Sequence, residues 1–167
     1  AVELDLEDGQ QLRVDTTVVE TNIHHPTDAT LLWDTVRTLT RLVDDLDGKL
    51  PRGVKGFPNR TRSARRRMQA LQRMTARQRE QQQTPKYREL IGITEQVVKN
   101  AKHVIAAAQR VRKVDAITRA AIDELCQQIA SFCQLGARVI DQTRRRVLQG
   151  ETVPAEEKLY SIFEPHT

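Results

Sequence analysis

Aromatic residues, cysteine and long apolar runs are all scarce in this sequence. Phe, Trp and Tyr make up 4% of its 167 residues, which is a small supply for the core of a large β-sandwich or barrel. No stretch approaches the about 20 apolar residues that span a bilayer. The first residues, AVELDLEDGQ, also lack the basic and then apolar layout of a signal peptide. We therefore expect a soluble cytoplasmic protein with no membrane partner.

The common motifs of nucleotide-binding proteins and hydrolases are missing as well. The sequence has no glycine-rich phosphate loop, no G-x-S-x-G motif, no H-E-x-x-H motif and no C-x-x-C pair. Its two cysteines, Cys126 and Cys133, lie seven positions apart in a helical pattern, too far along a straight helix for a disulfide. We expect buried, reduced thiols and no small-molecule substrate.

Acidic residues are absent from one long basic segment. Residues 48–79 contain eleven basic residues and no acidic one, whereas residues 1–47 contain three basic and eleven acidic residues. The chain as a whole has a formal net charge of +5. The basic residues of the segment are Lys49, Arg52, Lys55, Arg60, Arg62, Arg65, Arg66, Arg67, Arg73, Arg77 and Arg79.

Such a segment cannot neutralise its own charge. It is solvated, paired with the acidic N-terminal part, or in contact with a polyanion. We favour a polyanion, because basic clusters are the electrostatic footprint of nucleic-acid binding and guanidinium groups bind phosphate in a bidentate manner. The Arg-rich segment 49–79 is thus the predicted DNA-binding part, with a solvent-facing helix as the alternative. Its predicted DNA ligands are Arg60, Arg62, Arg65, Arg66, Arg67, Arg73, Arg77 and Arg79.

Apolar spacing predicts helices for most of the chain. Leucine and valine recur at helical spacing after Thr27 or Asp28, which can cap the helix, until Gly48 ends it. A thin apolar stripe over residues 60–83 predicts a largely solvated helix, and Thr84-Pro85 predicts the start of the next helix. Two long stripes, over residues 87–111 and 117–149, predict helices that fold back as an antiparallel hairpin.

Strand character is confined to the two ends. Residues 2–19 surround an Asp8-Gly9 turn and predict a β-hairpin, and the C-terminal KLYSIFEPHT predicts a further strand. So few strands are marginal alone. We therefore expect a predominantly α-helical chain that contains an incomplete sheet domain.

Potential ligands and acid–base groups are densest around the end of the predicted hairpin. They are Asp15, Glu20, His24, His25 and Asp28. Asp15 falls inside a strand, where aspartate is disfavoured unless it faces solvent or has a function. Paired histidines without a cysteine or a spaced third ligand are no zinc signature. The alternative that these are ordinary turn and surface groups therefore stays open.

One stretch carries a family resemblance. Residues 13–42 read RVDTTVVETNIHHPTDATLLWDTVRTLTRL. The Asp-x-Thr-x-Val strand, the N-I-x-x-P-T-D turn and the Leu-Leu helix resemble the start of the catalytic domain of DDE-type transposases of bacterial insertion sequences, in the IS5-like and ISNCY-like group. KLYSIFEPHT resembles the strand that re-enters the fold of this group after a long helical insertion. The helical middle matches by position and character only.

The resemblance implies an RNase H-like fold, in which residues 1–27 and 155–167 form a small, incomplete sheet and residues 28–154 are a helical insertion. It also implies that Asp15 is catalytic and binds Mg²⁺ as the first carboxylate of a triad. Two metal ions, about 4 Å apart, would serve phosphodiester cleavage and strand transfer. One aspartate cannot hold both, and we assign no counterpart here to the second Asp or the final Glu of the family pattern. Asp28 and Glu164 are not given these roles. We expect a truncated, nucleoid-associated transposase that binds DNA, does not hold Mg²⁺ stably and is inactive alone.

The alternative function belongs to another class. The helical hairpin of residues 84–149 would mediate self-association of a non-enzymatic interaction module, with the basic helix as a solvated face. Its partner would be a second copy of the chain, giving a homo-oligomer, rather than DNA.

Overall fold

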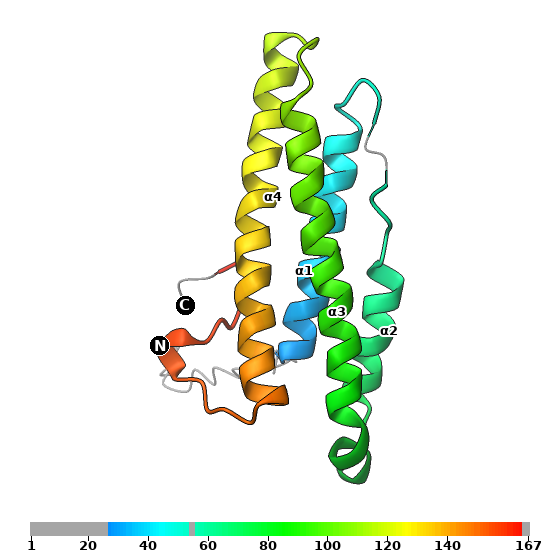
Figure 1. The fold of residues 1–167 in the computed structure, drawn as a ribbon, viewed down its shortest axis with the longest axis vertical. Coiled ribbons are helices and arrows are strands. Elements are labelled where there is room, and N and C mark those ends of the chain that lie inside the picture. Colours follow the sequence, from blue (N-terminus) through cyan, green and yellow to red (C-terminus); the bar gives the residue numbers. More distant parts are fainter. Residues whose placement is uncertain (1–26, 54–55, 165–167) are drawn as a thin grey trace, which may run out of the picture.

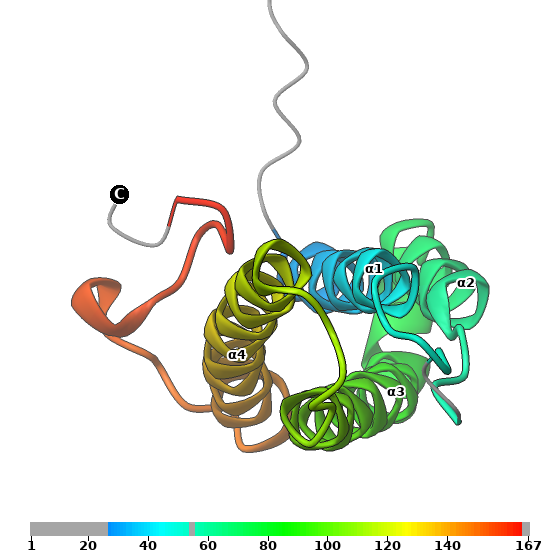
Figure 2. The ribbon, with the colours of Figure 1, turned by 90° about the horizontal axis from the view of Figure 1, so that it is seen from above.

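The computed structural model describes residues 27–53 and 56–164, which fold as a bundle of four α-helices (Figure 1). The helices are α1 (Asp28–Asp47), α2 (Thr61–Gln72), α3 (Ala76–Gln109) and α4 (Ala116–Thr143). A π-helical turn, η1 (Arg144–Leu148), continues α4, and a short 3-10 helix, η2 (Ala155–Glu157), lies in the C-terminal segment. Helices α1, α3 and α4 pack against one another, and α2 lies on the outer side of α1 and α3 (Figure 2).

The core consists of aliphatic side chains from α1, α3 and α4. Their apolar stripes face one another, so that the side chains are removed from water on all sides. Fully buried members include Leu32, Leu39, Leu46, Leu90, Val97, Ile122, Ile129 and Val139. As expected from the two long stripes, α3 and α4 run side by side in opposite directions (Figure 1). The thiols of Cys126 and Cys133 are free and buried, and burial raises the pKa of Cys133 to about 11.

The prediction of an RNase H-like sheet was wrong: the part of the chain that the structure describes contains helices and no strand. Residues 155–164, expected as a returning strand, form η2 and irregular backbone that lies against the bundle. The apolar side chains of Leu159 and Ile162, which suggested a strand, are buried against helices instead. The predicted hairpin of residues 2–19 lies outside the described residues.

A helical side chain takes the place of a strand partner at Leu159. The Leu159 backbone N–H donates to Oε1 of Gln142 over 2.7 Å, and the Leu159 carbonyl accepts from Nε2 of Gln142 over 3.4 Å. Both backbone groups are therefore satisfied without a neighbouring strand. This contact fixes the C-terminal segment on the end of α4.

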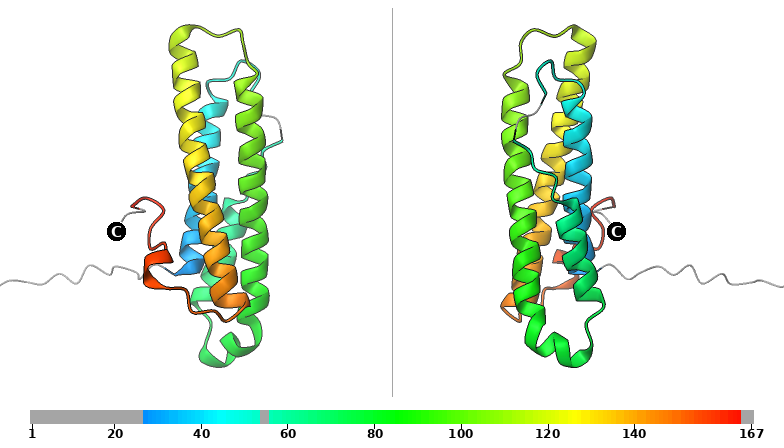
Figure 3. Two further views of the ribbon diagram at one scale, coloured as in Figure 1. Left: turned by 60° about the vertical axis from the view of Figure 1, so that its left-hand side comes forward. Right: turned by 90° about the vertical axis from the view of Figure 1, so that its right-hand side faces the viewer.

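The boundary between α2 and α3 also differs from the expected one at Thr84-Pro85. Helix α3 begins at Ala76, because Thr75 and Gln78 form a reciprocal capping box. Pro85 then lies inside α3, where it removes a helical hydrogen bond and crowds the preceding turn. Figure 3 shows the first turns of α3 lying across the lower end of the bundle, at an angle to the rest of the helix. Proline here bends the helix and does not start it.

Helices α1 and α4 pack closely at Gly136. A Cβ atom at this position would lie 2.6 Å from Cγ2 of Thr35 and 3.3 Å from Cγ2 of Val98. The Thr35 side chain is held in place because its hydroxyl donates to the Leu31 carbonyl over 2.9 Å. The absence of a side chain at position 136 therefore sets the distance between these two helices.

We expect Gly136→Ala to lower the free energy of unfolding by about 1–3 kcal/mol, the usual cost of overpacking a core. Urea unfolding followed by circular dichroism measures this change. Gly92→Ala is the matched control: Gly92 is an exposed residue of α3 with no heavy atom within 4 Å of an added Cβ. It should stabilise the bundle by up to about 1 kcal/mol through helix propensity. Stabilisation by both substitutions would contradict close packing at Gly136.

Candidate nucleic-acid interface

Helix α2 presents arginines on the side opposite to its buried residues. Ala64, Met68 and Leu71 face α1 and α3 and are buried. Helical spacing places Arg62, Arg66 and Arg73 together on the other side, with Arg65 beside them. We call Arg62, Arg65, Arg66 and Arg73 the arginine face of α2, and all four are exposed.

No carboxylate of the described residues pairs with the arginines of this surface. Seven of the eight predicted DNA ligands are exposed, and none of the seven forms an ion pair with another described residue. They are Arg60, Arg62, Arg65, Arg66, Arg73, Arg77 and Arg79. No carboxylate of the described residues therefore occupies these guanidinium groups.

Arg67, the eighth predicted ligand, has a different role. Its side chain is 31% exposed, its Nε donates to Oε2 of Glu89 over 3.2 Å, and its Nη1 donates to Oγ of Ser63 over 2.9 Å. The guanidinium therefore ties α2 to α3. Because the guanidinium group of Arg67 already bonds within the protein, Arg67 is not a candidate DNA contact.

A second arginine run, residues 144–146, shows how the bundle uses arginine structurally. Each of its members has a carboxylate partner. The pairs are Arg144 with Glu95, Arg145 with Glu151 and Glu157, and Arg146 with Asp28. Hydrogen bonds from Arg145 hold the pKa of the Glu151 carboxyl below its usual range. All three arginines of the η1 run are thus paired, whereas in the α2 run Arg67 is paired and Arg65 and Arg66 have no carboxylate partner among the described residues.

Asp28 belongs to a buried network at the lower end of the bundle. Its side chain is 6% exposed and accepts hydrogen bonds from Nε2 of Gln142 over 2.8 Å and from Nη1 of Arg146 over 2.9 Å. The same Gln142 amide holds Leu159. Burial and the nearby Asp28 charge raise the pKa of Tyr87 to about 12. The network joins the start of α1, the end of α4 and the C-terminal segment.

The described residues do not fit the magnesium site that the resemblance implies. Both oxygens of Asp28 accept hydrogen bonds from the protein, and residues 27–53 and 56–164 contain no group of three or more His, Cys, Asp or Glu side chains that could hold a metal ion. Asp15, Glu20, His24 and His25 lie outside the described residues. The predicted ligand Asp15 is thus not among the residues that the structure describes.

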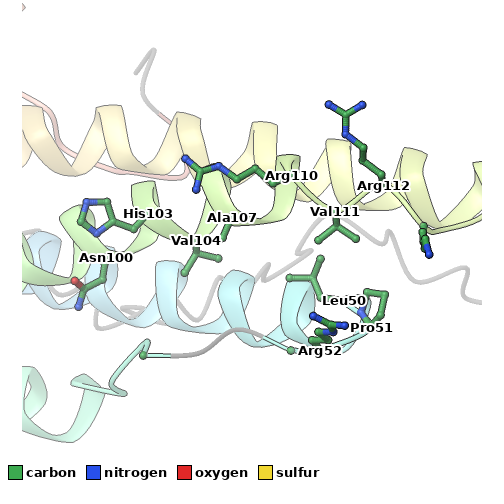
Figure 4. A pocket seen from close by; sticks show the side chains of 13 residues that line it. Leu50, Pro51, Arg52, Asn100, His103, Val104, Ala107, Arg110, Val111 and Arg112 are labelled. Atoms are coloured by element: carbon green, nitrogen blue, oxygen red, sulfur yellow. The ribbon is translucent and has the colours of Figure 1, made fainter.

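A second group of cations, which is not among the DNA ligands predicted from the sequence, lies at the upper end of the bundle. It surrounds a pocket of about 750 Å³ between the connector after α1 and the C-terminal half of α3 (Figure 4). We call Arg52, Arg110, Arg112 and Lys113 the end cluster, and all four are exposed. The pocket lining contains no carboxylate. Three cations within residues 110–113 were the sequence signal for this cluster.

Comparisons of the chain with protein-family models, curated proteins and solved structures find no match. Among the described residues, no helix is both long and apolar enough to cross a membrane. The function is therefore argued from the residues and their arrangement.

Removal of the Gln142 amide should release the C-terminal segment. We expect Gln142→Ala to cost about 1–3 kcal/mol, because Asp28 and both backbone groups of Leu159 lose a buried partner. Trypsin cleavage after Lys158, which is half-buried, should become faster under native conditions. Gln134→Ala, at an exposed position of α4, is the control. Equal cleavage rates in both variants would contradict the role given to Gln142.

Proposed function

We propose that this chain is part of a DDE-type transposase and that its helical bundle binds DNA through the exposed arginines of residues 60–79. DNA binding is supported by the seven exposed arginines that have no carboxylate partner among the described residues. The transposase assignment is supported by the motif of residues 13–42. DNA binding and the family assignment are thus supported by different parts of the chain.

Phosphate contact explains the α2 surface better than solubility does. A surface whose charge serves solubility carries both signs, whereas all charged residues from Gly48 to Arg79 are basic. Arginine is also the residue suited to bidentate phosphate binding. Phosphate contacts carry no direct sequence information, so we propose binding to the backbone with little sequence preference.

The geometry of the lower end supports a place within a larger transposase. The start of α1 and the C-terminal segment meet at Gln142, which contacts Asp28 and Leu159, 131 positions apart in the sequence. A helical module whose two ends lie together can occupy one place in a catalytic protein without disturbing the parts before and after it. Catalysis would depend on residues outside the described part, Asp15 among them.

No observation favours the self-association alternative. The apolar stripes of α3 and α4 that suggested it are used inside the bundle, where Leu90, Val97, Ile122 and Ile129 are fully or almost fully buried. The large apolar side chains that remain exposed in the described residues are those of Ile117, Tyr160 and Phe163. Tyr160 and Phe163 line one small pocket with Trp33, and small exposed apolar patches are normal for a monomeric protein.

Charge removal on α2 tests DNA binding. We expect Arg62→Gln/Arg66→Gln/Arg73→Gln to reduce the slope of log affinity against log salt by up to about 2.7, since each phosphate contact contributes about 0.9. Fluorescence titration of a labelled duplex of about two helical turns, at several salt concentrations, gives the slope. The control Lys99→Gln/Lys102→Gln/Arg138→Gln removes the same charge from exposed positions of α3 and α4. Equal effects of the two variants, or no binding by the unaltered chain, would overturn the proposal.

Arg67 separates structural from DNA-contacting arginines within the same segment. Arg67→Gln removes the pair with Glu89, so it should lower the free energy of unfolding by less than about 1 kcal/mol. The salt slope of DNA binding should stay that of the unaltered chain. Urea unfolding and the same titration measure both quantities, with Arg66→Gln as the single-charge control that lowers the slope alone. A slope lowered equally by both substitutions would place Arg67 among the DNA contacts.

A further inference from the structure

We infer that the end cluster (Arg52, Arg110, Arg112 and Lys113) is a second contact for the DNA backbone, about one helical turn of duplex away from the arginine face of α2. This inference rests on the proposed DNA binding and specifies the path of the duplex. Three observations support it. The pocket and α2 lie on the same face of α3, and the distance between them along α3 matches one turn of duplex. The cations of the end cluster extend outward and pair with no other described residue.

The pocket and α2 lie on the same side of α3. Glu89 of α3 contacts Arg67 of α2, which marks the face of α3 that is turned toward α2. Asn100 and Ala107, which line the pocket, follow Glu89 by about three and about five helical turns and so fall on the same face. Figure 1 likewise shows α2 and the connector after α1 along one side of α3.

The separation matches the repeat of a duplex. From Glu89, at the level of α2, to Arg110, in the end cluster, the rise along α3 is about 30 Å at about 1.5 Å per residue. One turn of B-DNA measures about 34 Å. A duplex laid along this face would therefore return the same strand to the protein at the end cluster.

The cations of the end cluster are available for such a contact. Figure 4 shows Val111 turned toward Leu50, whereas the side chains of Arg110 and Arg112 extend away from this apolar contact. None of the four cations forms an ion pair with another described residue. Carboxylates at this end belong to α1 and to the turn before α4, and none of them lines the pocket. They are Asp44, Asp45, Asp47 and Asp115.

Duplex length separates the two contacts experimentally. The variant Arg110→Gln/Arg112→Gln/Lys113→Gln should lower the salt slope on a duplex of about two turns by up to about 2.7. On a hairpin with a stem of about half a turn, which is too short to span both contacts at once, the variant should lower the slope by less than it does on the long duplex. Hydroxyl-radical footprinting should show two protected backbone regions one turn apart, and this variant should lose one of them.

The controls distinguish a failure of this inference from a failure of the proposed function. The variant of Lys99, Lys102 and Arg138 should leave the slope unchanged on both duplexes, and the variant of Arg62, Arg66 and Arg73 should weaken binding to both. Thermal melting by circular dichroism confirms that each variant is folded. If the unaltered chain binds and the end-cluster variant shows the same slope on the long duplex, this inference alone is overturned. If the unaltered chain binds neither duplex, the proposed function is overturned as well.

Discussion

Burial of three apolar stripes against one another, those of α1, α3 and α4, is the constraint on which the rest of the bundle depends. Side chains such as Leu39, Val97 and Ile129 are fully or almost fully removed from water, and this burial supplies the main favourable free energy of folding. Helix α2 contributes only Ala64, Met68 and Leu71 to the buried set. Helix α2 therefore packs on the outside of the bundle. Its arginines remain in water, because burying an unpaired charge would cost too much free energy.

Ion pairing then decides which arginines remain available. At η1, Arg145 and Arg146 are paired with carboxylates that come from the C-terminal segment and from the start of α1. On α2 only Arg67 meets such a partner, Glu89 of α3. Exposed pairs of this kind contribute little to stability, but they fix the positions of the helices. The unpaired arginines are consequently held on a rigid surface, which reduces the ordering cost of binding a polyanion.

The two ends of the bundle have different chemistry. At the lower end, Asp28, Gln142 and Leu159 form a satisfied, buried network, and a network of this kind rigidifies what it joins. At the upper end, apolar side chains form the floor of a pocket, and the cations around it form no ion pair with any residue that the structure describes. The buried network fixes the C-terminal segment on the lower end, whereas the cations of the end cluster face solvent at the upper end.

Residue spacing alone determined that this chain is mostly helical, that its long apolar stripes pack as an antiparallel pair, and that residues 48–79 carry uncompensated charge. These properties are local, because a helix of period 3.6 places its apolar and charged residues on fixed faces. The prediction of a strand in the C-terminal segment was wrong. Leu159 and Ile162 are buried there, but an apolar pattern of this kind fits irregular backbone packed against helices as well as it fits a strand. Only the tertiary structure showed that Gln142 satisfies the Leu159 backbone and that Thr75 and not Thr84 caps α3. It also showed that Arg67 is paired, whereas its neighbours meet no carboxylate in the part of the chain that the structure describes. Each of these outcomes depends on which side chains meet across helices or compete for a cap, and spacing along the chain does not contain that information.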